Sequence, residues 1–143
     1  MARFRFRATS FRPRSELLDF FADMTNAQSW DPSISSVARV DSGDVTFDSS
    51  FKVTLGFLNR ELELTYHVTR LEPGSVVVLR AETGLFISED TITVASLDGG
   101  ITALQYEARL VGKGAAALLD PFFKLSIDHF GKQAGAVLRR DYL

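Results

Sequence analysis

The chain has 143 residues, a net charge of −2 and no cysteine, which predicts a single domain over residues 1–143 without disulfides. A pI near 5.7 gives no electrostatic argument for a nucleic-acid partner. No window approaches the roughly 20 apolar residues of a membrane span, and the Arg-rich N-terminus lacks the continuous apolar region of a signal peptide. We therefore expect a cytoplasmic protein without stable membrane insertion.

The N-terminal segment predicts one strand followed by two short helices. Arg3–Ala8 alternates arginine with apolar residues, which is typical of a strand with one solvated face. Apolar residues at helical spacing predict a helix over Arg14–Met24, and a further helical turn is expected over Thr25–Trp30. Pro32 ends this segment, since the residue before a proline is pushed out of the α region.

The middle of the chain, Ile34 to Val111, predicts six consecutive strands. The clearest is Arg60–Leu71, where apolar residues including Tyr66 alternate with charged and polar ones. Consecutive strands usually pair with their neighbours, so an antiparallel sheet is expected. The other predicted strands are Ser36–Asp41, Ser50–Phe57, Ser75–Ala81, Phe86–Leu97 and Ile101–Val111.

The C-terminal segment Ala115–Tyr142 carries the only long helical pattern. Pro121 either kinks this helix or follows Asp120 as the cap of a new helix start. At about 100° per residue the apolar side chains share one broad arc, and Gly131 and Gly135 fall on the solvent side, where their spacing hints at a homodimer contact. The arc contains Leu119, Phe122, Phe123, Ile127, Phe130, Ala134, Val137 and Leu138.

Two polar residues, Ser126 and Gln133, are predicted near the centre of this apolar arc. A buried hydroxyl or amide costs free energy unless it finds a partner. Ser126 can bond back to the carbonyl of Phe122. Gln133 either reaches polar groups of the sheet or meets water or a ligand in a cavity.

The residue constellations typical of common catalytic sites are missing from the sequence. With only two histidines the chain cannot form a three-histidine zinc site, and we predict neither a metal nor a cofactor. His67 is expected on the surface and His129 at the margin of the helix arc. Asp90 shares the inward face if Ile92 does, where its pKa would rise; the favoured alternative is a surface position or an ion pair with Arg80.

Five motifs occur in this order of elements: Trp30-Asp31-Pro32, the Glu72-Pro73 turn, Asp90–Val94, Ala103–Ala108 and Leu119-Asp120-Pro121. In these motifs the sequence resembles the SRPBCC superfamily, the START-like helix-grip group that includes polyketide cyclase/dehydrase-like proteins. The resemblance covers nearly the whole chain and implies an α+β fold, with a curved antiparallel sheet of about seven strands around the C-terminal helix. It also implies a hydrophobic cavity between them, but no shared catalytic residues.

The leading hypothesis is therefore binding or transport of a small hydrophobic molecule, such as a lipid or a polyketide-like aromatic. One alternative is a cyclase or aromatase in which Asp90, Tyr66 or Tyr106 moves protons. The other is a structural or regulatory protein with a filled core. The residues predicted to contact the ligand are Trp30, Tyr66, Asp90, Tyr106, Phe123, Ser126, Phe130 and Gln133.

Overall fold

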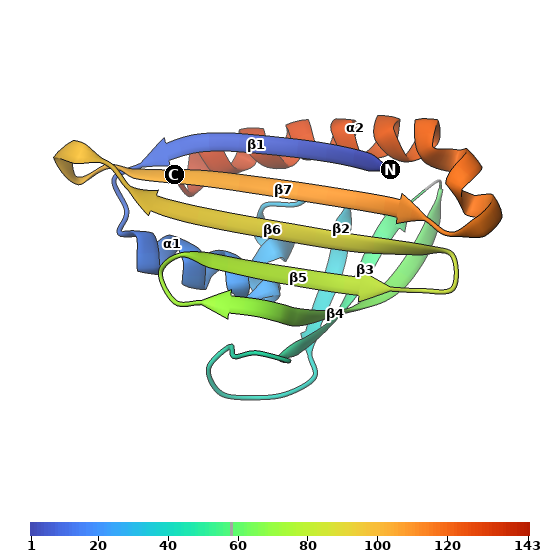
Figure 1. Cartoon of the computed structure of the whole chain (residues 1–143), viewed down its shortest axis with the longest axis horizontal. Coiled ribbons are helices and arrows are strands. Elements are labelled where there is room, and N and C mark those ends of the chain that lie inside the picture. The colour runs from blue at the N-terminus through green and yellow to red at the C-terminus, as the bar shows by residue number, and fades with distance from the viewer. Residues whose placement is uncertain (58) are drawn as a thin grey trace.

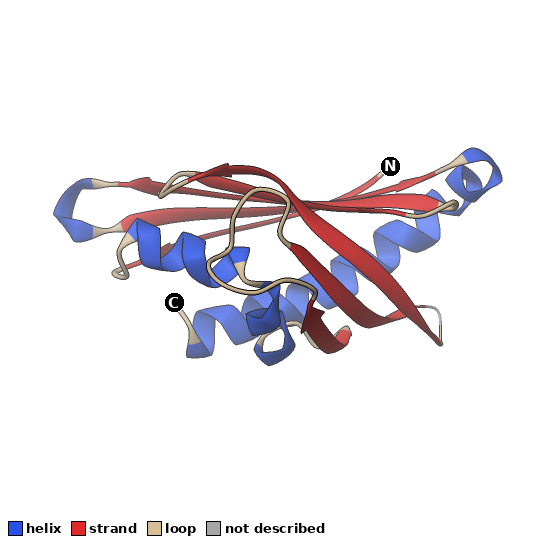
Figure 2. Cartoon of the chain, turned by 90° about the horizontal axis from the view of Figure 1, so that it is seen from below, coloured by secondary structure: helices blue, strands red, loops and turns tan. Residues whose placement is uncertain are grey.

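A curved antiparallel sheet forms one layer of the structure, and two helices pack on one of its faces (Figures 1 and 2). The computed structural model describes residues 1–57 and 59–143. The helical elements are α1 (Arg14–Ala22), η1 (Met24–Ser29), η2 (Asp98–Gly100), η3 (Gly114–Leu119) and α2 (Asp120–Asp141), where η marks a 3-10 helix. The strands are β1 (Ala2–Ser10), β2 (Ile34–Arg39), β3 (Ser50–Phe57), β4 (Arg60–Glu72), β5 (Val76–Glu82), β6 (Phe86–Ser96) and β7 (Thr102–Gly112). The predicted α+β helix-grip fold is confirmed.

The seven strands follow the order β1-β7-β6-β5-β4-β3-β2. Strands β2 to β7 therefore pair as consecutive hairpins, as predicted, and β1 pairs with β7 to form an edge. The register shifts between Ile34 and Ser36 in β2 and between Val68 and Arg70 in β4. Such irregularities bend and twist a strand locally. In Figure 2 the β3–β4 end curves away from the β1–β7 end, which opens the concave face.

Helix α2 packs mainly against β1 and less against β7. Two glycines permit this close approach. A Cβ added at Gly131 would lie 2.6 Å from the Phe4 ring, and one added at Gly135 would lie 2.8 Å from the Phe6 ring. The helix also satisfies carbonyls of the edge strand, because Lys124 Nζ donates to Arg3 O at 2.6 Å and an Arg139 guanidinium nitrogen donates to Arg7 O at 2.7 Å. Covering an edge in this way protects it from pairing with other chains.

The predicted orientation of the C-terminal helix was wrong in part. Gly131 and Gly135 face β1, which removes the basis for a homodimer contact, and Gln133 is exposed. Glycine adds nothing to a hydrophobic pattern, so the pattern was centred on the large side chains at one margin of the buried face. Ile127 lies in the middle of the buried face. At about 100° per residue, Gln133 lies about 120° around the helix from Ile127, and therefore outside that face.

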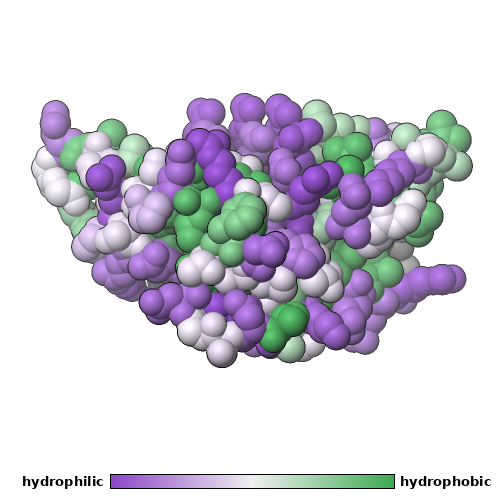
Figure 3. Space-filling model, turned by 60° about the horizontal axis from the view of Figure 1, so that its bottom comes forward, coloured by the Kyte–Doolittle hydropathy of each residue, from purple (hydrophilic) through white to green (hydrophobic). Residues whose placement is uncertain are grey.

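Several apolar side chains at the start of the C-terminal helical segment are exposed, because the buried face of the helix is turned away from the predicted arc. Phe122 is 56% exposed and Leu119 is 41% exposed, although both were predicted on the buried arc. On the face in view in Figure 3, hydrophobic surface occurs as separate groups between hydrophilic ones. Helix α2 begins at Asp120 with Pro121 in its first turn, after η3. A new helix start near Pro121 is thus correct, but the N-cap residue is Leu119 and not Asp120.

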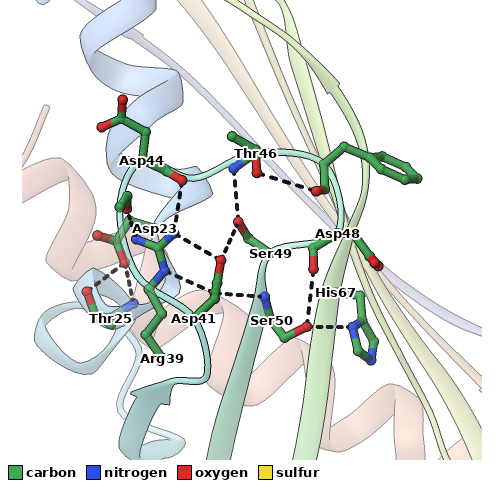
Figure 4. A network of polar contacts seen from close by, with 12 residues as sticks. Asp23, Thr25, Arg39, Asp41, Asp44, Thr46, Asp48, Ser49, Ser50 and His67 are labelled. Atoms are coloured by element: carbon green, nitrogen blue, oxygen red, sulfur yellow. Dashed lines mark hydrogen bonds and ion pairs between the residues drawn. The ribbon is translucent and has the colours of Figure 1, made fainter.

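A polar network fixes the loop between β2 and β3 (Figure 4). Arg39 donates to the carbonyl of Asp44 at 3.0 Å and pairs with Asp41 at 3.3 Å, and this pairing lowers the pKa of Asp41. The buried Ser49 hydroxyl donates to Asp41 at 3.2 Å. His67 is exposed, as predicted, and its Nδ1 lies 2.8 Å from the hydroxyl of Ser50. These contacts position the start of β3 and lie apart from the cavity described next.

Candidate functional site

A cavity of about 170 Å³ lies between the concave face of the sheet, the α1–η1 segment and α2. Most of its wall is apolar, with Phe4 and Phe6 from β1, Phe86 from β6, and Ile127 and Phe130 from α2. These side chains face one another because the glycines of α2 bring the helix close to β1 while β3 and β4 curve away. A dry apolar cavity of about 150 Å³ is large enough to bind benzene, so this one can hold one aromatic ring.

Small residues in the sheet leave room for polar side chains on the same wall. Ala81 lies opposite Ser88 on β6, and Tyr66 on β4 reaches across to place its hydroxyl 2.7 Å from the Ser88 hydroxyl. Ala108 lies opposite Asp90, and the Tyr106 hydroxyl donates to Asp90 Oδ2 at 2.6 Å. The wall therefore carries two neighbouring hydrogen-bonded pairs.

Asp90 has an unusual electrostatic environment. Burial raises its pKa from 3.8 to about 7, the hydrogen bond from Tyr106 opposes this rise, and the nearby carboxylate of Asp31 adds to it. Burial also raises the pKa of Tyr66 and Tyr106, and the Asp90 charge raises both further. Both tyrosines are consequently neutral hydrogen-bonding groups around neutral pH, where Asp90 is divided between its acid and carboxylate forms.

The predicted ion pair between Asp90 and Arg80 is wrong. Arg80 lies opposite Glu89, whereas Asp90 lies opposite the buried Leu79. Arg80 therefore points to the other face of the sheet, where its guanidinium bonds Glu82 at 3.1 Å. Because side chains alternate along a strand, a register difference of one residue separates the two faces.

A second polar group comes from the segment between η1 and β2. The backbone N–H and hydroxyl of Ser33 both donate to Asp31 Oδ1, at 2.9 and 2.7 Å. Burial raises the pKa of Asp31 despite these bonds. Trp30 is only 6% exposed, and its ring meets Phe21 and Tyr106 edge-on, with 5.6 Å between centroids in each case. Its indole N–H is buried and has no hydrogen-bond partner among the described residues.

The structure places six of the eight predicted site residues on the cavity wall. They are Trp30, Tyr66, Asp90, Tyr106, Ser126 and Phe130. Phe123 is buried but packs against Phe86, with 6.3 Å between ring centroids, rather than lining the cavity. Gln133 is exposed and its amide lies 3.4 Å from the His129 ring, so its predicted place on the wall is wrong. The role of the six residues in binding stays a prediction.

Three polar residues of the wall, Asp31, Ser33 and Ser88, were not among the predicted site residues. An aspartate followed two residues later by serine is a turn signal, because the carboxylate can accept from the backbone at that position. That signal predicts the bond to Ser33. It carries no information about which side of the turn faces the cavity.

Two features are absent from the described part of the chain. Over residues 1–57 and 59–143, no group of three or more histidine, aspartate or glutamate side chains could hold a metal ion. Within the same residues, no helix has the length and hydropathy that crossing a membrane requires.

Comparisons with known proteins agree with the fold. None of the curated proteins compared with the chain matches it significantly. The structure of the Zhui aromatase/cyclase from Streptomyces sp. R1128 aligns with a TM-score of 0.75 and 13% identity, covering 96% of this chain and 94% of that one. A START superfamily protein from Mycobacterium smegmatis aligns with a TM-score of 0.71 and 10% identity, covering 96% and 97%.

A third solved structure is longer than this chain. The di-domain ARO/CYC protein BexL from the BE-7585A biosynthetic pathway aligns with a TM-score of 0.72 and 14% identity, covering 99% of this chain and 46% of BexL. The chain thus spans about half the length of BexL, and identities this low establish the fold alone. The family described as polyketide cyclase/dehydrase and lipid transport matches residues 1–135. The chain therefore belongs to this family, within the SRPBCC superfamily.

Proposed function

We propose that the protein binds a small hydrophobic molecule in the cavity between the sheet and α2. The observation that carries this proposal is an apolar cavity with a few polar groups gathered on part of its wall, which is the usual composition of a small-molecule site. The family's association with lipid transport and polyketide cyclisation is consistent with such a ligand. The presence of open space also favours binding over the alternative of a structural protein with a filled core.

The volume of the cavity limits what it can hold without rearrangement. At about 170 Å³ it is smaller than the roughly 300–1,000 Å³ of most ligand pockets. One ring with a short chain fits this space. A larger molecule would have to displace α2 from the β3–β4 side, where the helix packs less than it does against β1.

The proposal is tested by native mass spectrometry of the protein purified from cells, compared with two leucine variants. Ala108→Leu fills the space beside Asp90 on the cavity wall. Ala136→Leu is the matched control on the exposed face of α2. The expected result is a bound small molecule in the wild type and in Ala136→Leu that is lost in Ala108→Leu. Equal occupancy in all three proteins would place the ligand elsewhere and would contradict the proposal.

A second candidate function is proton-transfer catalysis on the bound ligand, as in a cyclase. The observation that favours it is Asp90, because a cavity carboxylate with a pKa of about 7 can act as a general base or acid near neutral pH. Its carboxylate would remove a proton from the carbon next to a ketone, leaving an enolate that Tyr106 or Tyr66 can stabilise by hydrogen bonding.

Deuterium exchange at the α-carbons of 4-phenyl-2-butanone, followed by NMR in heavy water, measures this activity directly. The expected result is faster exchange with the wild type than with Asp90→Asn, at equal ligand occupancy. Identical exchange rates for the two proteins would refute a catalytic role for Asp90 and would leave binding as the function.

A further inference from the structure

The charged groups of the cavity all have the same sign. The lining residues among those the structure describes include two carboxylates, Asp31 and Asp90, and no lysine, arginine or histidine. Nearby cations are engaged outside the cavity: Arg109 pairs with Glu89 at 3.3 Å, and Arg80 pairs with Glu82 at 3.1 Å. A negatively charged ligand would meet repulsion from the wall without a compensating partner.

The polar groups on the wall also differ in whether they already have hydrogen-bond partners. Asp31 Oδ1 already accepts two hydrogen bonds from Ser33, and Asp90 Oδ2 accepts one from Tyr106. The indole N–H of Trp30 is buried and has no partner among the residues that the structure describes. A buried donor without an acceptor costs free energy, which an acceptor on a ligand would recover. Among the described lining residues, the Trp30 N–H is the one fully buried polar side-chain atom without a partner, and what it lacks is a hydrogen-bond acceptor.

The position of that donor is fixed by packing. The Trp30 ring is held edge-on between Phe21 and Tyr106, so its N–H cannot easily turn toward another partner. Tyr106 joins Trp30 to Asp90, since its ring contacts the indole and its hydroxyl bonds the carboxyl group. Trp30, Asp31 and Asp90 all line this cavity.

We propose that the cavity selects hydrophobic ligands with an uncharged oxygen acceptor, a hydroxyl or a carbonyl that receives the Trp30 N–H, and excludes carboxylates. This inference rests on the proposed function, because it concerns the same cavity. An ammonium group would be attracted by the carboxylates, but it has no acceptor to offer Trp30. A fatty-acid carboxylate could accept that bond, but it would add a negative charge beside two acidic groups, on a wall whose described lining residues include no cation.

Matched ligands with one phenyl ring separate these possibilities by isothermal titration calorimetry. The set is 3-phenyl-1-propanol, 4-phenyl-2-butanone, 3-phenylpropanoate and 3-phenylpropylamine, with toluene as the reference without a polar group. At about pH 8 the acid is ionised and the amine is charged. The alcohol and the ketone are expected to bind at least about tenfold more tightly than the acid, a ratio that a single repulsive contact can produce.

Two variants assign the effect to named groups. Trp30→Phe keeps an aromatic ring but removes the donor, so the preference for the alcohol over toluene should fall by about tenfold. Asp31→Asn should raise the affinity of the acid relative to the alcohol. Both readouts are affinity ratios within one protein, so a general loss of stability does not imitate them.

The possible results separate the inferred ligand selectivity from the proposed function, which is ligand binding in the cavity. If toluene binds but the acid and the alcohol have equal affinities, the proposed selectivity is wrong. The same holds if the amine binds most tightly. In both cases binding in the cavity is still supported. If toluene and all four polar ligands fail to bind, the proposed function itself is contradicted.

Discussion

Replacing Asp90 with asparagine removes an ionisable group from the cavity wall while keeping its shape. The asparagine Oδ1 can still accept the hydrogen bond that Tyr106 now donates at 2.6 Å. The variant therefore isolates the free-energy cost of ionising a carboxyl group in this apolar place. We expect it to change the pH dependence of stability more than stability at low pH.

The direction in which stability changes with pH follows from the direction of the pKa shift of Asp90. The pKa of Asp90 is raised from 3.8 to about 7 in the folded protein, so between these values the folded state holds a proton that the unfolded state has released. Stability then falls as pH rises, by up to about 1.4 kcal/mol per pH unit, and becomes constant above the folded pKa. Between about pH 5 and pH 8 the wild type should lose about 3 kcal/mol more than Asp90→Asn, an upper limit that water entering the cavity would reduce.

Urea denaturation of both proteins at several pH values measures this difference, since other titrating groups cancel between them. At about pH 4 and below, where Asp90 is protonated in both states, the two proteins should have similar free energies of unfolding, and the variant should become the more stable as the pH rises toward 7. If the difference between the two proteins is the same at every pH, Asp90 is well solvated and the reasoning about its environment is refuted.

Three further variants test neighbouring parts of the structure. Tyr106→Phe removes the donor to Asp90 and should cost about 1–3 kcal/mol above neutral pH, with a smaller loss near pH 5 because a neutral acid accepts a weaker bond; urea denaturation at both pH values checks this. Gly135→Ala brings a Cβ to 2.8 Å from the Phe6 ring, so an overpacking cost of about 1–3 kcal/mol outweighs or cancels the gain of about 1 kcal/mol in helix propensity. A clear rise in its melting temperature would contradict the close packing of α2 on β1. Gln133→Leu lies on the exposed face and should change stability by less than about 0.5 kcal/mol and leave ligand binding intact, whereas weakened binding would return this residue to the site.

Strand positions were predictable because alternation along a strand determines the facing of every side chain. The pattern of the Arg60–Leu71 strand was enough to turn Tyr66 inward, and the structure agrees. Tyr106 followed in the same way on its own strand. The partner of Asp90 could not be predicted, because it depends on the register between two strands, and Arg80 proved to lie opposite Glu89.

The helix and the turn were less predictable for different reasons. The facing of α2 depends on Gly131 and Gly135 fitting against the rings of Phe4 and Phe6, a contact that no hydrophobic scale records. Asp31 sits in a turn without periodicity, so its side-chain direction is set only by tertiary packing. The sequence therefore placed the large aromatic residues of the cavity better than its charged ones.

The most direct test of binding in the cavity uses the indole N–H of Trp30. The chain contains one tryptophan, so its side chain gives one indole signal in a nitrogen-15 correlation NMR spectrum. Titration with 3-phenyl-1-propanol should shift this signal downfield in a saturable manner, because the buried N–H gains an acceptor, and Ala108→Leu should abolish the shift. An indole signal that stays in place while the signals of surface residues move would show that the ligand binds outside the cavity and would contradict the account.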